Sequence, residues 1–447
     1  MNSTALPGMS ARVAQAAAWL TPRRLRAQAI LLALCLWGVC AVDFATPGLF
    51  DRDGNVKFQD FLPLYVSGRL IAQGRASDLY NQQVIAGEIE AIIHPDAHAA
   101  GGQLLCSLRL SAPASANLRL PNLYGPQVAL LFAPFSRLSF PAAAWAWTTA
   151  SLLVFFASTY LVWRTCPRLR PHARFVAIAG LAFPPLFHFF VRGQLSVLVL
   201  VCFTATFLAL RAGRGWLAGI ALGLLLVKPQ FLVAIPLVIV LAGAWKMLAG
   251  LSLSAAAQLV LARIYFGSAV MRAYLDTLWH MSRWLGTAEL GLAPIQMHSL
   301  RSFWALLIPW PDIALTLYIL SSIVIVTMAA SVWKSASPLA LRFSAFTLAA
   351  VLANPHLFIY DLLVLAPTLL LLVDWSLANP HHPSAPALQL LSYLAFVLPL
   401  LGPLSRWTHF QLSVPVLCAL LCVLRRHSAD LAPPAPEQLA SRYSRVV

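Results

Sequence analysis

Charge is scarce in this chain, and negative charge is scarcest. Only 15 of the 447 residues are aspartate or glutamate, and charged residues make up 10% of the chain, against 60% hydrophobic residues. The mean hydropathy is +0.76. A chain this apolar cannot cover a soluble core with polar surface. The composition therefore excludes a water-soluble globule and predicts an all-α polytopic membrane protein.

Cysteine offers no framework, and lysine is nearly absent. None of the seven cysteines has a neighbour in a zinc-site context, and Cys106 is alone in the longest polar segment. We therefore predict no metal centre, no cofactor and no disulfide in that segment. Only four of the 31 basic residues are lysines. We ascribe this bias to codon composition rather than to function.

Arginine supplies most of the net charge of +16, yet its placement argues against nucleic acid as a partner. The arginines stand in short clusters between hydrophobic runs, as in residues 23–26, 164–174, 211–214 and 425–426. Such clusters mark the cytoplasmic loops of membrane proteins under the positive-inside rule. We expect membrane lipids, and no nucleic acid, around this protein.

Apolar runs bounded by charge, proline or glycine predict about twelve transmembrane helices (10–12). The first run lacks a convincing small-residue cleavage site, so we interpret it as a retained signal anchor. Residues 1–26 then form a cytoplasmic N-terminal segment, residues 27–427 the membrane domain, and residues 428–447 a disordered cytoplasmic tail. The predicted spans are 27–45, 141–163, 174–191, 194–211, 214–228, 229–245, 247–266, 312–332, 338–353, 356–374, 386–404 and 408–424.

This topology leaves two long extracytoplasmic loops, residues 46–124 and residues 267–302. The first follows the first helix and holds seven of the 15 acidic residues. Most of these are expected to be solvated, but Asp60 stands among apolar residues, which favours a position near the membrane surface. The stretch 124–138 is apolar but too short to span, so it predicts a re-entrant or interfacial helix.

Several segments bring rare polar groups to the same outer face. Taken singly, an arginine at a helix end can snorkel, and a lone histidine is more often an interfacial residue than a catalyst. A lysine or aspartate in an apolar run must be paired or reach water. Besides Asp60, the candidates are Tyr124, Arg192, Gln194, Lys228, His298, Arg301 and His356, with Asp361 one turn deeper.

One carboxylate beside several cations and amides suits sugar transfer from a lipid phosphate. The leaving phosphate is a stable anion that needs no acid, and preorganised cations such as Lys228, Arg301 or His356 can stabilise its charge. A single base, Asp60, would accept the proton of the attacking hydroxyl. Sugar hydrolysis, by contrast, usually requires two carboxylates.

Short motifs follow one another in a definite order along the chain. They are Gln59-Asp60-Phe61, Asp78-Leu79-Tyr80, Tyr124-Gly125-Pro126, Gly193-Gln194, Lys228-Pro229, His298-Ser299-Leu300 and Asn354-Pro355-His356. Over roughly residues 27–375, this order resembles glycosyltransferase family 87. The resemblance implies a GT-C fold and an inverting transferase with a periplasm-facing site, in which the aspartate of the first outer loop, by position Asp60, is the base.

The resemblance also implies the substrates and the location. The donor would be a polyprenyl-phosphate sugar, carrying a hexose (most often mannose) or a pentose. The acceptor would be a lipid- or glycan-linked hydroxyl, and the protein would lie in the plasma (inner) membrane. Two departures, Gly125 for the usual first proline and Met297-His298 for the usual Asn-Gln, affect the pockets, so the sugar and acceptor are not carried over.

Two other classes of function stay open at this point. A transporter or flippase of lipid-linked or anionic solutes would use the same cationic outer mouth without chemistry. It should, however, show paired broken helices at the midplane and charges deeper in the spans. A non-catalytic scaffold gives no reason for Lys228 or Asp361 to lie in the membrane.

Overall fold

The computed structural model describes residues 9–94, 124–284 and 296–430. Within these ranges the regular secondary structure is helical, and no β-strand is formed. Two isolated β-bridges pair Phe50 with Val56 and Met297 with Phe358. The prediction of an all-α fold is confirmed. Cys106 and the end of the predicted tail lie outside the described residues.

Six helical segments of the described chain are long and apolar enough to cross a membrane, or seven if one bent pair is a single span. The bent pair changes direction by 50° between its two helices. The six are α2 (Pro22–Phe44), α8 (Phe140–Trp163), α14 (Trp245–Trp284), α16 (Pro311–Lys334), 3₁₀ helix η9 (Ile359–Val364) with α18 (Leu365–Ala378), and α19 (Ala385–Val397) with η10 (Leu398–Leu404) and α20 (Ser405–Thr408); the bent pair is α9 (Ala173–Leu181) and α10 (Pro184–Arg192).

The predicted count of twelve spans is therefore not confirmed. Each remaining predicted span contains a helix, but these helices have only 8 to 17 residues. At 1.5 Å per residue, most are shorter than the hydrocarbon core of a bilayer. They are α11 (Ser196–Arg211), α12 (Gly215–Gly223), α13 (Ile235–Ala242), α17 (Leu339–Leu352) and α21 (Ser413–Ala429).

Helices α12 and α13 are short because the chain unwinds between them. Lys228 has φ −135° and ψ 78°, and it separates the 3₁₀ helices η5 (Leu224–Val227) and η6 (Pro229–Leu232). A residue before proline avoids the helical region, and proline lacks the N–H that would continue the helix. The lysine thus lies in an irregular connection rather than within a regular span.

Helix α12 packs tightly against α14 through small residues. A Cβ on Gly219 would lie 2.0 Å from the Met247 carbonyl oxygen, and a Cβ on Gly250 would lie 2.3 Å from that of Trp216. Glycines at such contacts let two membrane helices approach each other closely. The short α12 is therefore fixed by its contact with α14.

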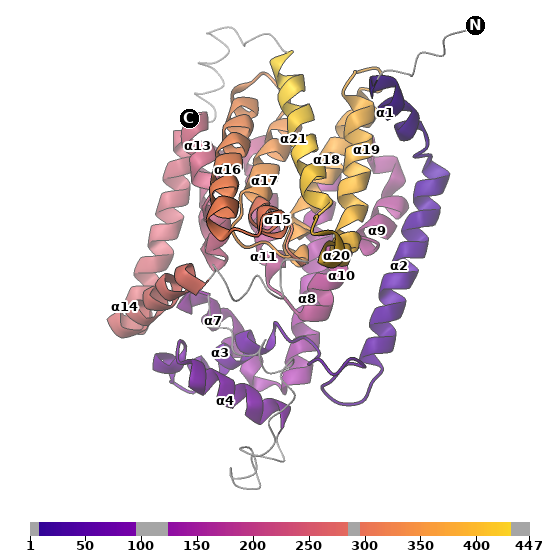
Figure 1. Ribbon diagram of the computed structural model, residues 1–447. Helices are drawn as coiled ribbons and strands as arrows, with labels where there is room; N and C mark the ends of the chain where they lie inside the picture. The colour runs from indigo at the N-terminus through magenta and orange to yellow at the C-terminus, as the bar shows by residue number, and fades with distance from the viewer. Residues whose placement is uncertain (1–8, 95–123, 285–295, 431–447) are drawn as a thin grey trace, which may run out of the picture.

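Helix α14 changes direction at Gly267, where φ is 80° and ψ is 175°. The predicted span boundary at residue 266 coincides with this break. The following segment, predicted as the start of an outer loop, is instead helical as far as Trp284. Figure 1 shows it turning towards α7, and the rings of Tyr274 and Tyr80 lie 5.6 Å apart.

The polar segment after α2 forms a small helical layer at one end of the molecule (Figure 1). Its described part is largely helical, so one continuous loop over 46–124 is not confirmed. Gly68 lets two of its helices meet, because a Cβ there would lie 2.4 Å from the Phe132 carbonyl. The layer comprises α3 (Leu62–Ala72), η1 (Ala76–Asp78), α4 (Gln82–Ile93), α7 (Pro126–Phe132) and η3 (Ala133–Arg137).

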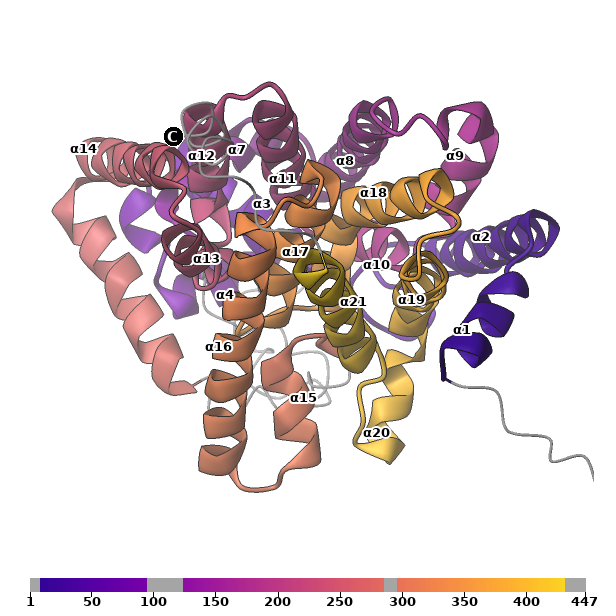
Figure 2. The same cartoon turned by 90° about the horizontal axis from the view of Figure 1, so that it is seen from above.

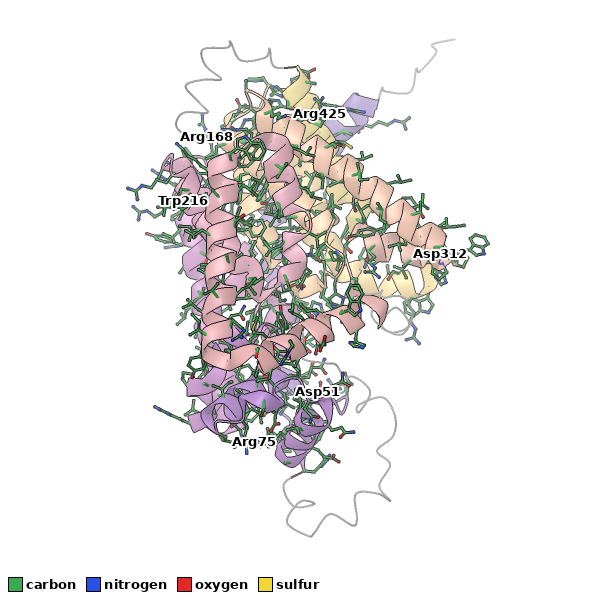
Figure 3. The ribbon with its side chains drawn as sticks, turned by 90° about the vertical axis from the view of Figure 1, so that its left-hand side faces the viewer. Asp51, Arg75, Arg168, Trp216, Asp312 and Arg425 are labelled. Atoms are coloured by element: carbon green, nitrogen blue, oxygen red, sulfur yellow. The ribbon has the colours of Figure 1, made fainter. Side chains whose placement is uncertain are left out.

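Helix α1 (Met9–Ala18) and the last turns of α21 lie at the opposite end of the bundle from this layer (Figure 1). Figure 3 shows Arg168 and Arg425 near one end, and Asp51 and Arg75 near the other. The predicted N-terminal segment contains a helix, α1 (Met9–Ala18), which lies beside α19 in Figure 2.

Candidate functional site

The backbone of Asp60 is held between aromatic residues at the start of the helical layer. Phe58 and Phe61 are 3% and 0% exposed, and the Phe61 ring packs against Phe132 and Trp147. The Asp60 N–H donates to the Arg192 carbonyl at 3.1 Å. Since both neighbouring side chains are buried, the aspartate has a fixed backbone position at the junction of the layer and the bundle.

The carboxylate of Asp60 meets an amide and a guanidinium from the turn between α10 and α11. Gln194 donates from Nε2 to Oδ2 at 2.7 Å, and Nη1 of Arg192 lies 3.8 Å from Oδ1. Arg192 also donates from Nη2 to Oε1 of Gln296 at 3.0 Å. About a fifth of the Asp60 side chain is exposed, so the carboxylate is oriented and still accessible.

The turn that presents Gln194 depends on Gly193. Its φ of 70° is left-handed, and a Cβ would lie 2.8 Å from Cβ of Phe61. Trp147 donates from Nε1 to the Gly193 carbonyl at 3.1 Å, with the Gln194 carbonyl at 3.3 Å. Only glycine combines that φ with so close a neighbour at little cost.

Tyr124 contacts this cluster from the α7 side. Its hydroxyl donates to Oε1 of Gln194 over a long 3.5 Å, and the Tyr80 hydroxyl donates to the Tyr124 carbonyl at 2.8 Å. Burial raises the pKa of Tyr124 well above its usual value, and the charges of Asp60 and Asp361 raise it further. The phenol therefore stays protonated as a donor. We call Asp60, Tyr124, Arg192, Gln194 and Gln296 the Asp60 cluster.

Lys228 does not join the Asp60 cluster directly; it forms a buried ion pair with Asp361. The Nζ–Oδ1 distance is 2.5 Å, and the two side chains are 2% and 1% exposed. Ser196 accepts from Nζ at 2.9 Å and donates to the same carboxylate oxygen at 2.7 Å. Lys228 is thus paired with a carboxylate, one of the two states that the sequence predicts for it, and its predicted part in the donor site stays a prediction.

His298 is held in the bundle by α21 and by the segment before η9. It is fully buried, its Nδ1 lies 2.7 Å from Oγ of Ser413, and its N–H donates to the Leu357 carbonyl at 2.9 Å. Burial, with His188 adding to the effect, lowers the pKa of His298 to about 3. The ring is therefore neutral at pH 7 in this conformation, and the predicted place of His298 in the donor site stays a prediction.

His356 and Arg301 come from two further segments of the chain. The His356 N–H donates to Oδ1 of Asn354 at 2.9 Å, and its ring meets that of Phe358 edge-on at 4.7 Å. Arg301 stands in the first turn of α15 (Leu300–Leu307). The contacts that define the Asp60 cluster do not include either residue.

Sequence reasoning missed several members of the site. Gln296 comes from a segment without a regular pattern, and Ser196 is an ordinary helix-start residue until its partners are known. Asp361 stood out as a carboxylate in an apolar run, but its partner was not identifiable from spacing. In the described residues, no three histidine, cysteine, aspartate or glutamate side chains form a group that could hold a metal ion.

Comparison with known families identifies the chain. The model of Glycosyltransferase family 87 matches residues 122–359, which is more than half of the sequence. The chain belongs to glycosyltransferase family 87. No curated protein and no solved structure matches it. As a member of this family with several membrane-length helices, the protein is a membrane glycosyltransferase.

The matched range of this family 87 glycosyltransferase includes most of the candidate site. It includes Tyr124, Gln194 and Lys228. Asp60 lies before it and Asp361 lies after it. The family match therefore supports the reaction class and does not itself assign the base. The assignment of Asp60 depends on its geometry.

Proposed function

We propose that this glycosyltransferase is an inverting enzyme that takes its sugar from a polyprenyl phosphate. The sugar is a hexose, with mannose as the first candidate, or a pentose. The acceptor is a lipid- or glycan-linked hydroxyl at the extracytoplasmic face of the plasma (inner) membrane. Asp60 is the general base of this reaction.

The observation that carries the proposal is the environment of the Asp60 carboxylate. One oxygen accepts a 2.7 Å hydrogen bond from Gln194, while the other lies 3.8 Å from Arg192, which is longer than a hydrogen bond. The second oxygen therefore has capacity to accept a hydrogen bond from a substrate hydroxyl. A general base needs this combination of fixed orientation and an open acceptor position.

In the proposed reaction, the acceptor hydroxyl attacks the anomeric carbon as its proton passes to Asp60. The bond from that carbon to the phosphate oxygen breaks, and the electron pair leaves with the polyprenyl phosphate. Because that leaving group is a stable anion, no general acid is required. Displacement from the opposite face inverts the anomeric centre.

Arg192 is the best-placed cation for the leaving phosphate. Its guanidinium lies beside the Asp60 carboxylate and is about a quarter exposed. Its planar fork suits phosphate oxygens. Lys228 lies deeper, where its ion pair with Asp361 supports Ser196, two residues from Gln194. We therefore propose that Lys228 positions the turn, and that His356 and Arg301 contribute to the outer part of the donor site.

The direct test is sugar transfer by the purified protein. The enzyme is incubated with a panel of radiolabelled polyprenyl-phosphate sugars and a lipid extract, and labelled products are separated. Transfer from one donor of the panel is expected. If no labelled product forms, and the same protein moves a lipid-linked solute across vesicle membranes, the alternative of a transporter or flippase replaces this proposal.

A further inference from the structure

Gln127, the second residue of α7, carries a buried side-chain amide without a partner. Both Oε1 and Nε2 are inaccessible to solvent, and neither makes a hydrogen bond to a group of the described residues. Leaving both ends of a buried carboxamide unpaired costs stability, so its presence needs an explanation.

The amide lies over Gly125, the residue after Tyr124. A Cβ at Gly125 would lie 2.5 Å from Oε1 of Gln127 and 2.6 Å from its Nε2. Gly125 has φ −59° and ψ 151°, which any residue can adopt. The backbone therefore does not require glycine here, but a side chain at this position would displace the Gln127 amide.

The helix that carries this amide is firmly fixed beside the Asp60 cluster. Val128 and Phe132 are 2% and 0% exposed, and Phe132 meets Gly68 of α3 without room for a methyl group. On the other side of Gly125, Tyr124 reaches Gln194 and is itself held by Tyr80. The unpaired amide thus sits next to the cluster on a rigid support, as a preorganised binding group would.

We propose that Gln127 is a specificity-determining residue that binds a pair of sugar hydroxyls of the substrate beside Tyr124. A carboxamide offers an acceptor and two donors, and neighbouring sugar hydroxyls offer both in return. The hydroxyls belong either to the donor sugar or to a sugar of the acceptor. This inference rests on the proposed sugar transfer and names a recognition element for it.

The test replaces Gln127 by leucine, which keeps the volume and removes the amide. Purified wild-type and Gln127→Leu proteins are compared in melting temperature and in kcat/KM for two polyprenyl-phosphate hexoses that are epimers. The melting temperature should stay equal or rise, because an unpaired buried amide has been removed. The preference between the epimers should fall by about tenfold or more, since a site built to bind a hydroxyl rejects its absence strongly.

The two sources of the hydroxyls give different results. A donor-sugar contact lowers discrimination between donor epimers, whereas an acceptor contact raises KM for the acceptor and lowers discrimination between acceptor epimers. Gly125→Ala provides the matched variant, because its methyl group displaces the amide without removing it. It should reproduce the loss of discrimination, and the double variant should add little to either single change.

The outcomes separate this inference from the proposed function. If the wild-type enzyme transfers no sugar, the proposed function fails. If it does transfer sugar, and Gln127→Leu keeps wild-type selectivity for both substrates, the inference alone is overturned. A lower melting temperature with unchanged selectivity would assign Gln127 a purely structural role.

Discussion

The residues of the site differ in whether their charge is exposed, paired with an opposite charge, or absent. The Asp60 side chain is about a fifth exposed beside Arg192, whereas Lys228 and Asp361 neutralise each other out of contact with water. His298 is buried as a neutral ring. Sequence alone placed all of these residues on one face, but it could not say which charges were already paired. That distinction depends on contacts between residues more than 100 positions apart.

His298 gives the protein a defined sensitivity to acid. Its pKa is about 3 in the folded state, against about 6.5 for an unperturbed histidine. Between these values the unfolded state binds the proton and the folded state does not. The stabilising contribution is therefore complete above about pH 6.5 and is lost as the pH falls towards 3.

We expect His298→Gln to weaken this dependence. The melting temperature of the wild-type protein in detergent should fall more steeply from about pH 7 to about pH 4.5 than that of the variant. The exposed His381 serves as the control, and His381→Gln should retain the wild-type slope. Parallel slopes for His298→Gln and the wild type would contradict the assignment of a buried neutral ring.

At the scale of elements, the ion pair joins the start of α11 to the connection before α13 and to η9. Ser196 and Asp361 belong to α11 and η9, and Lys228 lies in the unwound connection. Lys228→Ala would leave Asp361 as an uncompensated buried charge, which typically costs about 3–5 kcal/mol. Replacing both partners, as in Lys228→Met with Asp361→Leu, should cost much less.

A double-mutant cycle measures this difference: the melting temperatures of the wild type, the two single variants and the double variant are compared. The single change should lower the melting temperature strongly, and the double variant should recover most of the loss. KM for the donor should also stay near the wild-type value in the stable double variant, because Lys228 positions the turn. A large rise in that KM would restore the direct phosphate role for Lys228.

The sequence predicted the helical segments better than the way in which they cross the membrane. Each apolar run that predicted a span contains a helix in the structure. The predicted boundary at residue 266 coincides with the break in α14 at Gly267. The pattern could not show that the connection at Lys228 shortens α12 and α13, or that α9 and α10 bend by 50°. A hydrophobic segment can be buried either in lipid or in protein. Hydrophobicity alone therefore does not distinguish a helix that spans the membrane from a short helix covered by protein.

At the scale of the whole molecule, the basic residues Arg168 and Arg425 and the helical layer lie at opposite ends (Figure 3). This agrees with the segregation that the positive-inside rule predicts, and it puts the Asp60 cluster next to the layer. Because membrane orientation depends on loop charge, the end with Arg168 and Arg425 is predicted to be cytoplasmic. The side that faces the exterior remains part of the proposal.

Cysteine labelling checks that orientation. In a background without native cysteines, Asp51→Cys should react with a membrane-impermeant maleimide in intact cells. Arg425→Cys should react only after the membrane is permeabilised, because it lies at the opposite end. Labelling of Arg425→Cys in intact cells, with Asp51→Cys protected, would reverse the proposed topology.

The central claim is that Asp60 is the base for sugar transfer. The decisive measurement compares turnover and donor binding of Asp60→Asn with those of the wild type, using Asp53→Asn, a change at an exposed residue of the same segment before α3, as the control. We predict that Asp60→Asn lowers kcat by at least about 10²-fold while its expression and donor affinity stay close to the wild type, and that the control keeps full activity. Near-normal turnover by Asp60→Asn would contradict this account.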